Sequence, residues 1–144
     1  MDNKSIEEIY ELISTSASLG EVLPVSREDI RTRSAFYEKK NEAVVAYASI
    51  AETGHYQMIS SVIVHPDFRG QGLGRMVVRQ AVEFAIKNST KPVVAVANSN
   101  SHNLFLGLGF QEIAKTAAPE ELWGGRTMDE WLTCDRYCMQ LPTV

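Results

Sequence analysis

The segment from Val62 to Arg75 constrains the fold of this chain more than any other. It begins with Val62-Ile63-Val64, three β-branched residues that suit a buried strand. Pro66 then ends strand pairing, because proline has no N–H to donate. Three glycines follow, which let the backbone turn and leave its N–H groups uncovered: Gly70, Gly72 and Gly74. The segment therefore predicts a strand, a tight loop and the start of a helix.

A helix from Gln71 to about Asn88 is predicted next, because apolar residues recur there at helical spacing. The first N–H groups of a helix form an anion site, since the helix dipole is positive at that end. Arg69 and Arg75 add positive charge beside it. A Walker loop is excluded because no Lys-Ser or Lys-Thr follows the last glycine, and the glycine spacing of a dinucleotide site is absent. The glycines alone also allow an ordinary strand-to-helix turn.

Two motifs resemble those of a known family. Residues Arg69 to Gly74 fit the pattern Arg/Gln-x-x-Gly-x-Gly/Ala, which carries the pyrophosphate of acetyl-CoA in the GNAT superfamily of N-acyltransferases. Residues Leu104 to Phe110 are similar to the family motif Leu-Tyr-Glu-Lys-Leu-Gly-Phe. Asn98 stands where the family often has an asparagine at the end of its fifth strand. Both motifs occur in the family's order, with a helix and a strand expected between them.

A narrower resemblance is to the acetyltransferase domain of N-acetylglutamate synthases. It rests on the segment Leu23 to Ser26, on Leu104-Phe105 and on the cysteine-bearing tail. Val25 departs from the pattern, because those proteins usually carry arginine there. The tail also has fewer cysteines, and residues 1–144 contain no amino-acid kinase domain.

The composition suits one globular domain over residues 1–144. The net charge is −4 and no basic run occurs, so nucleic acid is not expected as a partner. No apolar stretch is long enough to cross a bilayer, and the N-terminal residues lack the apolar core of a signal peptide. We therefore expect a cytoplasmic protein without a membrane partner, either a monomer or a homodimer.

No metal site is expected. The two cysteines, Cys134 and Cys138, lack the Cys-x-x-Cys spacing and a second pair. The three histidines, His55, His65 and His102, are scattered. Two free thiols are the simplest interpretation.

Periodicity and turn residues predict the remaining elements. Helices are expected over residues 5–19, capped by Ser5, over 26–33 and over 102–108. Strands are expected over 35–38, 43–50, 57–64, 93–97, 110–113 and 137–141. The first three strands predict an antiparallel meander, 93–97 a central strand parallel to 59–64, and 137–141 an edge strand. Residues 116–130 show little periodicity, and the strand with which most GNAT chains begin is short or missing.

The resemblance implies an α+β (mixed α/β) GNAT fold. Its central sheet is mixed and mostly antiparallel, with helices on both faces. The family's fourth and fifth strands, here Ile59–Val64 and Val93–Ala97, are expected to splay apart and admit acyl-CoA.

Acetyl-CoA is the cosubstrate that the resemblance implies. Amides of Gln71 to Arg75 are expected to hold the pyrophosphate, and the pantetheine arm is expected to follow the backbone of Val62 and Val64. A backbone N–H of that strand would polarise the thioester carbonyl. The full set of predicted cofactor-binding residues is Val62, Ile63, Val64, Arg69, Gly70, Gln71, Gly72, Leu73, Gly74, Arg75, Asn98, Asn103 and Phe105.

The acid and base of the reaction depart from the family pattern. Met58 stands where many relatives place a glutamate base, so Glu52 and His55 are candidates that would act through water. Phe105 replaces the tyrosine that often protonates the thiolate, which leaves His102 as a candidate acid. A thiol pKa of about 8.5 makes the thiolate a tolerable leaving group without an acid. An ordinary surface side chain is the simpler interpretation of each polar candidate.

The acceptor is the least determined part of the site. Arg27, Arg31 and Arg33 are candidates for binding a substrate carboxylate, or are solvated surface residues. The leading hypothesis is an acetyl-CoA-dependent N-acetyltransferase, in which the amine of a small molecule or amino acid attacks the thioester directly. The alternatives are a module that binds acyl-CoA with little catalysis and a protein or peptide N-acetyltransferase.

Overall fold

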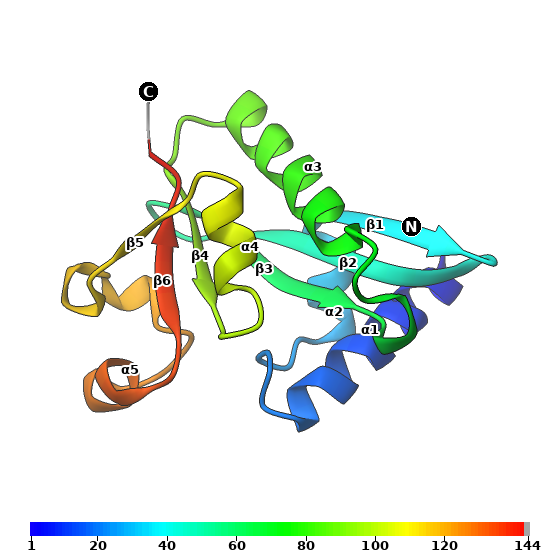
Figure 1. Ribbon diagram of the computed structural model, residues 1–144, viewed down its shortest axis with the longest axis horizontal. Coiled ribbons are helices and arrows are strands. Elements are labelled where there is room, and N and C mark those ends of the chain that lie inside the picture. Colours follow the sequence, from blue (N-terminus) through cyan, green and yellow to red (C-terminus); the bar gives the residue numbers. More distant parts are fainter. Residues whose placement is uncertain (143–144) are drawn as a thin grey trace.

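A computed structural model describes residues 1–142. Its six-stranded sheet has the order β1-β2-β3-β4-β6-β5, is mostly antiparallel and carries helices on both faces (Figure 1). The strands are β1 Ser34–Lys40, β2 Ala43–Glu52, β3 Gln57–Val64, β4 Val93–Ala97, β5 Gln111–Ile113 and β6 Tyr137–Gln140. The α-helices are α1 Asn3–Ser18, α2 Arg27–Thr32, α3 Leu73–Asn88, α4 His102–Gly107 and α5 Met128–Thr133.

Helix α1 begins two residues earlier than the sequence predicts. Asp2, not Ser5, is the N-cap, and its carboxylate accepts a hydrogen bond from the Ser5 N–H at 2.8 Å. Ser5 is instead buried inside the first turn. Aspartate and serine are both good capping residues, and Asp2 is the N-cap because its backbone is extended.

The meander of β1, β2 and β3 is confirmed, with antiparallel pairing throughout. Strand β1 extends further at both ends than expected, and β2 continues to Glu52. Strand β3 has the expected bounds. Alternating apolar residues place one face of this meander against α3 and the other against α1 and α2.

Strands β3 and β4 run parallel, but they pair over only three positions. The pairing joins Gln57–Ile59 to Val93–Ala95 and then stops. At this point β3 contains a bulge, seen as a register shift against β2 between Tyr47 and Ser49. Ser61 within it has a φ of 58°. The splayed strands that the resemblance implies are therefore present.

The C-terminal region corrects two expectations. Strand β6 pairs with β4 on one side and β5 on the other, so it is an internal strand and β5 is the edge. The region without periodicity contains two short 3-10 helices, Lys115–Ala117 and Glu120–Leu122, and helix α5. It is nonetheless anchored, because Trp131 of α5 is fully buried. One large residue can secure a segment too short to show periodicity.

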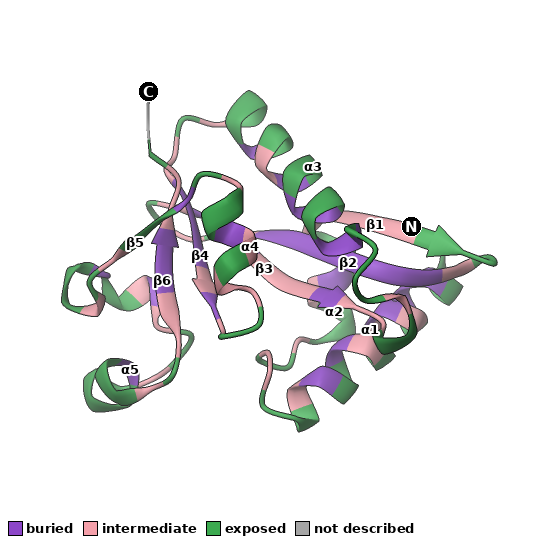
Figure 2. Ribbon diagram, in the orientation of Figure 1, coloured by how far each residue is buried: buried purple, intermediate pink, exposed green. Residues whose placement is uncertain are grey.

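Three apolar clusters make up the core. One joins the sheet to α3 and α4, one joins β2 and β3 to α1 and α2, and one places α5 and the 3-10 helices against β4 and β6. Figure 2 shows the buried stripes of α1 and α3 facing the sheet and their outer faces exposed. Over residues 1–142, no helix combines the length and the apolar character needed to cross a bilayer.

Candidate active site

Two cavities meet where β3 and β4 diverge. The loop groove, of about 480 Å³, lies between the second half of β3, the glycine-rich loop and the residues before α4. The inner pocket, of about 240 Å³, lies between β3, β4, the connector from α1 to α2 and the C-terminal loop. Five residues line both cavities, which makes the two continuous: Glu21, Val22, Val62, Asn98 and Ser101.

The glycine-rich loop exposes its backbone to the loop groove. Gly70 and Gly72 have φ values of 80° and 77°, and a Cβ on either would meet no atom within 4 Å. Helix α3 begins at Leu73, two residues later than predicted, because left-handed Gly72 is its N-cap. Glycine offers no side-chain cap, so the first N–H groups of α3 remain available to an anion.

Gly74 has a different purpose, because it allows close packing. A Cβ there would lie 3.2 Å from Leu104 Cδ1 and 3.3 Å from Val64 Cγ2. Because Gly74 has no Cβ, the first turn of α3 lies directly against β3 and α4.

The bulge in β3 redirects backbone N–H groups toward the loop groove. The Gln57 N–H donates to the Pro92 carbonyl, on the β4 side, at 2.9 Å. The His65 N–H donates to the Val45 carbonyl of β2 at 2.7 Å. In a regular strand these two N–H groups would point the same way, because they are eight residues apart. The bulge inverts this alternation, so the N–H groups of Val62 and Val64 point away from β2.

Charged groups flank the loop groove. Arg69 Nε donates to the Val64 carbonyl at 3.4 Å, and Arg69 Nη2 lies 3.8 Å from the Glu21 carboxylate. Arg75 Nη2 donates to the Gly107 carbonyl at 3.4 Å. Both arginines are exposed at the rim of the groove.

Asn98 ties the end of β4 to its surroundings. Its Nδ2 donates to the Glu21 carbonyl at 2.7 Å, and its Oδ1 accepts from the Asn100 and Ser101 N–H groups, each at 2.9 Å. Because these bonds engage both ends of the amide, its visible function is to hold the connector beside both cavities.

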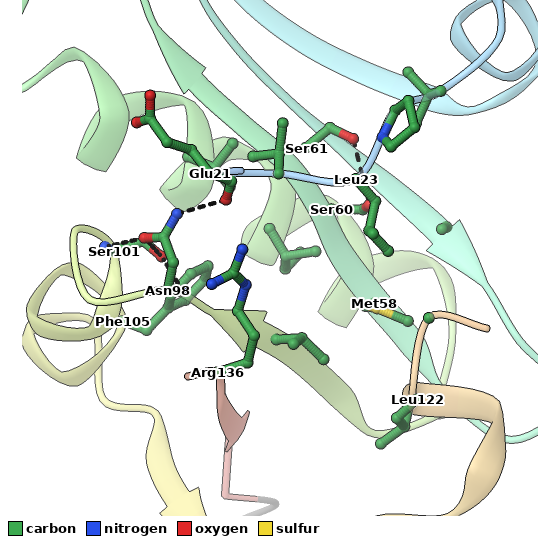
Figure 3. A pocket seen from close by; sticks show the side chains of 18 of the residues that line it. Glu21, Leu23, Met58, Ser60, Ser61, Asn98, Ser101, Phe105, Leu122 and Arg136 are labelled. Atoms are coloured by element: carbon green, nitrogen blue, oxygen red, sulfur yellow. Dashed lines mark hydrogen bonds between the residues drawn. The ribbon is translucent and has the colours of Figure 1, made fainter. Parts of the chain in front are cut away.

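The inner pocket combines an apolar floor with charged residues, of which Figure 3 shows Arg136 and Glu21. Met58, Phe105 and Leu122 supply part of the floor, and Phe105 is 2% exposed against the edge of Phe110. Three arginines are among the lining residues, Arg33, Arg126 and Arg136, together with one acidic residue, Glu21. The sequence indicated only Arg33, because Arg126 and Arg136 lie outside any motif and reach the pocket through the fold alone.

The three arginines differ in their protein partners. Arg136 is engaged with the Asp135 carboxylate at 2.7 Å and with the Gly20 carbonyl. Arg126 makes one hydrogen bond, from Nη1 to the Trp123 carbonyl at 3.0 Å. Arg33 Nη2 lies 3.9 Å from the Asp29 carboxylate, beyond hydrogen-bond distance. Arg33 and Arg126 therefore retain donors for a ligand.

Sequence and structure comparisons place this arrangement in a family. A sequence model of the acetyltransferase (GNAT) family matches residues 4–110. The chain belongs to this family. It is 32% identical over 81 residues to an uncharacterized N-acetyltransferase of Gracilaria tenuistipitata var. liui, a match covering 55% of this chain and 44% of that protein. A Pyropia yezoensis relative is 28% identical over 117 residues, with coverages of 75% and 67%. The chain thus spans less than half the length of the Gracilaria relative.

Solved GNAT structures share the fold at low identity. N-acetylglutamate synthase of Neisseria gonorrhoeae, complexed with coenzyme A and N-acetyl-glutamate, superposes with a TM-score of 0.78 at 17% identity over 99% of this chain and 34% of that one. Rv2747 of Mycobacterium tuberculosis, in complex with CoA and NLQ, gives 0.74 at 19% identity over 97% and 95%. A ribosomal-protein-alanine N-acetyltransferase of Brucella melitensis gives 0.73 at 19% over 97% and 95%.

The cofactor-binding residues predicted for this GNAT chain lie mostly around the two cavities. Val62, Ile63, Val64, Arg69, Gly70, Gly72, Leu73, Gly74, Arg75 and Asn98 line the loop groove, and Phe105 lines the inner pocket. Gln71 and Asn103 are exposed and line neither cavity. The binding role of the whole set stays a prediction.

The structure does not bring the predicted acid and base to the cavities. Glu52 is exposed at the end of β2 and lines neither. His55 Nδ1 lies 3.1 Å from the Glu121 carboxylate, away from both. His102 Nε2 lies 2.9 Å from the Glu112 carboxylate, and its ring stacks on Tyr137 at 4.1 Å. Catalytic roles for Glu52 and His102 receive no support from this placement.

Two of the predicted substrate arginines also lie elsewhere. Arg27 Nε donates to the Glu7 carboxylate at 2.6 Å, and the guanidinium lies 3.9 Å from the Tyr10 ring centre. Arg31 is exposed, with its Nη1 3.9 Å from Glu28. Neither lines the inner pocket. Arg27 instead joins α2 to α1.

Proposed function

We propose that this GNAT chain transfers the acetyl group of acetyl-CoA to the amine of a small molecule that also carries a carboxylate, an amino acid being the simplest example. The observation that carries the proposal is the inner pocket, where three arginines and one acid surround an apolar floor beside the loop groove. Partly buried guanidinium groups favour an anionic ligand, because arginine binds carboxylates through paired, charge-assisted hydrogen bonds.

The loop groove fits acetyl-CoA. Uncapped N–H groups at the start of α3, with Arg69 beside them, suit the pyrophosphate. The N–H groups of Val62 and Val64 suit the pantetheine amides and the thioester carbonyl. This arrangement would deliver the acetyl group to the junction of the two cavities, next to Phe105.

The transfer is a direct attack. The neutral amine nitrogen bonds to the thioester carbonyl carbon, and the oxygen of the resulting tetrahedral intermediate carries negative charge. An N–H of β3 stabilises that oxygen. The C–S bond then breaks, CoA leaves as a thiolate, and the proton lost from the nitrogen passes to water or to the thiolate.

An α-amine needs a weaker base than a lysine amine does. The α-amine of a peptide has a pKa of about 7.7–8.0, whereas a lysine amine with a pKa of about 10.4 is less than about 1% neutral at pH 8. The α-amine of a free amino acid lies between the two, because its own carboxylate stabilises the ammonium form. Met58 lies where relatives carry a base, and it lines the inner pocket. We infer that α-amines and other easily deprotonated amines are preferred over lysine side chains.

The shape of the inner pocket supports a small acceptor. Its volume of about 240 Å³ suits a single amino acid, and the connector and the C-terminal loop cover it. Fold similarity alone does not select the acceptor, because neighbours include both N-acetylglutamate synthase and ribosomal-protein-alanine N-acetyltransferase.

Paired acceptors test the proposal. We expect thiol release from acetyl-CoA with amino acids, and much slower release with the corresponding amines that lack the carboxylate. Arg126→Gln should raise KM for the amino acid by about tenfold or more, since a hydrogen bond to a charged group contributes about 1.5–3 kcal/mol. It should leave the KM of the amine unchanged.

Arg31→Gln is the matched control, because it removes an exposed guanidinium of α2 that lies outside the pocket. Equal effects of the two substitutions would contradict the carboxylate role of the pocket. Turnover of peptides but not amino acids would favour a peptide N-acetyltransferase. Tight acetyl-CoA binding without turnover of any acceptor would favour a binding module.

A further inference from the structure

The bulge in β3 is a strained element at the centre of the site. Ser61 has a φ of 58°, a left-handed conformation that costs a non-glycine residue about 1–2 kcal/mol. Such geometry persists only where neighbouring groups hold it in place. The Ser60 and Ser61 hydroxyls are 3.5 Å apart, and both residues line the inner pocket (Figure 3).

Ser49 of β2 is the side chain that contacts the bulge. Its side chain is fully buried, at 0% exposure, and its Oγ donates to the Ser60 carbonyl at 3.1 Å. Ser49 is also the β2 residue at which the register against β3 shifts. A hydroxyl at this position has no access to solvent, and its hydrogen bond to the Ser60 carbonyl ties β2 to the bulge.

The register of β3 decides what its backbone presents to the cofactor. Without the bulge, the N–H groups of Val62 and Val64 would point toward β2 and not toward the loop groove, because alternation along a strand has a period of two. Their side chains would also move to the opposite face of the sheet. The direction of the Val62 and Val64 N–H groups therefore depends on the bulge staying at its position in β3.

We propose that Ser49 is a positioning residue for acetyl transfer. By donating to the Ser60 carbonyl, its hydroxyl holds the bulge so that the Val62 N–H stays aimed at the thioester carbonyl. Ser49 touches neither substrate nor cofactor, since it lines neither cavity. The role rests on the proposed acetyl transfer.

The test compares Ser49→Ala and the near-isosteric Ser49→Cys with the wild type. Each should lower kcat by about tenfold or more. Removing one oxyanion-hole donor lowers kcat by about 10²–10³-fold, and a donor that points in the wrong direction should cause part of that loss. The KM of the acceptor should change less than about threefold, because the arginines proposed to bind its carboxylate are unchanged. Ser49→Thr, which keeps the hydroxyl, should restore most of kcat.

A matched control is Ser5→Ala, which removes a hydroxyl that is 1% exposed in α1, far from the bulge. It should leave kcat unchanged. An equal loss of kcat in Ser5→Ala and Ser49→Ala would overturn the positioning role, because the effect would then follow from destabilisation in general.

Amide chemical shifts provide a readout that does not depend on turnover. In the wild type, the Val62 amide proton should shift further with acetyl-CoA than with CoA, because only acetyl-CoA carries the thioester carbonyl. Ser49→Ala should abolish this difference while CoA still binds. An unchanged Val62 shift in Ser49→Ala would overturn the role of Ser49 alone. Failure of the wild type to bind acetyl-CoA would overturn the proposed function, and this role with it.

Discussion

At the scale of single residues, the two cysteines show how position in the fold sets reactivity. Cys138 lies in β6 at 1% exposure, and burial raises the pKa of its thiol to about 11. Cys134 is partly exposed at the end of α5, where Lys115 Nζ lies 3.4 Å from its Sγ. Only four positions separate them in the sequence, yet only one is accessible to a reagent.

We predict that iodoacetamide labels Cys134 at pH 8 while Cys138 stays unlabelled, as measured by peptide mass spectrometry. The thiolate is the reactive form, and at pH 8 roughly one in a thousand Cys138 thiols would be ionised. The unfolded chain ionises this thiol near pH 8.5. Stability contributed by Cys138 is therefore complete below that pH and is lost as the pH rises toward 11. Equal labelling of both cysteines in the native protein would contradict the burial of β6.

At the scale of elements, the loop between β3 and α3 is built around backbone conformation. Gly72 has a φ of 77° and serves as the N-cap of α3, so the first turn of the helix depends on it. No side chain shares that cap. The proposed anion site therefore depends on the loop geometry more than on any side chain.

Gly72→Ala should weaken acetyl-CoA binding by about fivefold, measured by titration calorimetry. A left-handed alanine costs about 1 kcal/mol or more, which the loop would avoid by rearranging away from the binding geometry. Gly125→Ala is the control, because Gly125 has a φ of 79° and equally open surroundings but lies in the C-terminal loop. If both substitutions weaken binding alike, the loop is not the pyrophosphate site.

At the scale of the whole molecule, the sheet is continuous from the meander to the C-terminal strands. Strand β4 pairs with β3 on one side and with β6 on the other. The cluster around Trp131 includes Val94 of β4 and, at its edge, Met58 of β3. We therefore propose that the part of the chain beyond the family match, after residue 110, folds together with the rest.

Coincident unfolding transitions are the expected consequence. Trp123 and Trp131, the two tryptophans of the chain, both lie in the C-terminal region, so fluorescence reports on that region alone. Far-UV circular dichroism reports on every helix and strand. In urea the two signals should give one midpoint, as in two-state unfolding. A fluorescence midpoint at clearly lower urea would mean that the C-terminal region unfolds independently.

Local sequence chemistry determined the elements and the motif. The bounds of β3 and β4 could be predicted from their β-branched residues, and the loop from its proline and glycines. The strands and the loop both depend on residues that are neighbours along the chain. The family pattern in that loop located the loop groove for the same reason. The residues that could be predicted are those whose conformation depends mainly on their neighbours in the sequence.

Contacts between distant segments were decided only by the tertiary structure. No sequence signal marks the bulge at Ser61, because serine has no preference for a φ of 58° and is held there by β2. The place of β6 inside the sheet depends on which strand edges remain free once β3 and β4 have paired. Arg33, Arg126 and Arg136 come from three separate segments, so their meeting in one pocket depends on how the chain packs. The sequence by itself therefore determined the strand, the glycine-rich loop and the helix beside the loop groove, and the tertiary structure decided which residues surround the inner pocket.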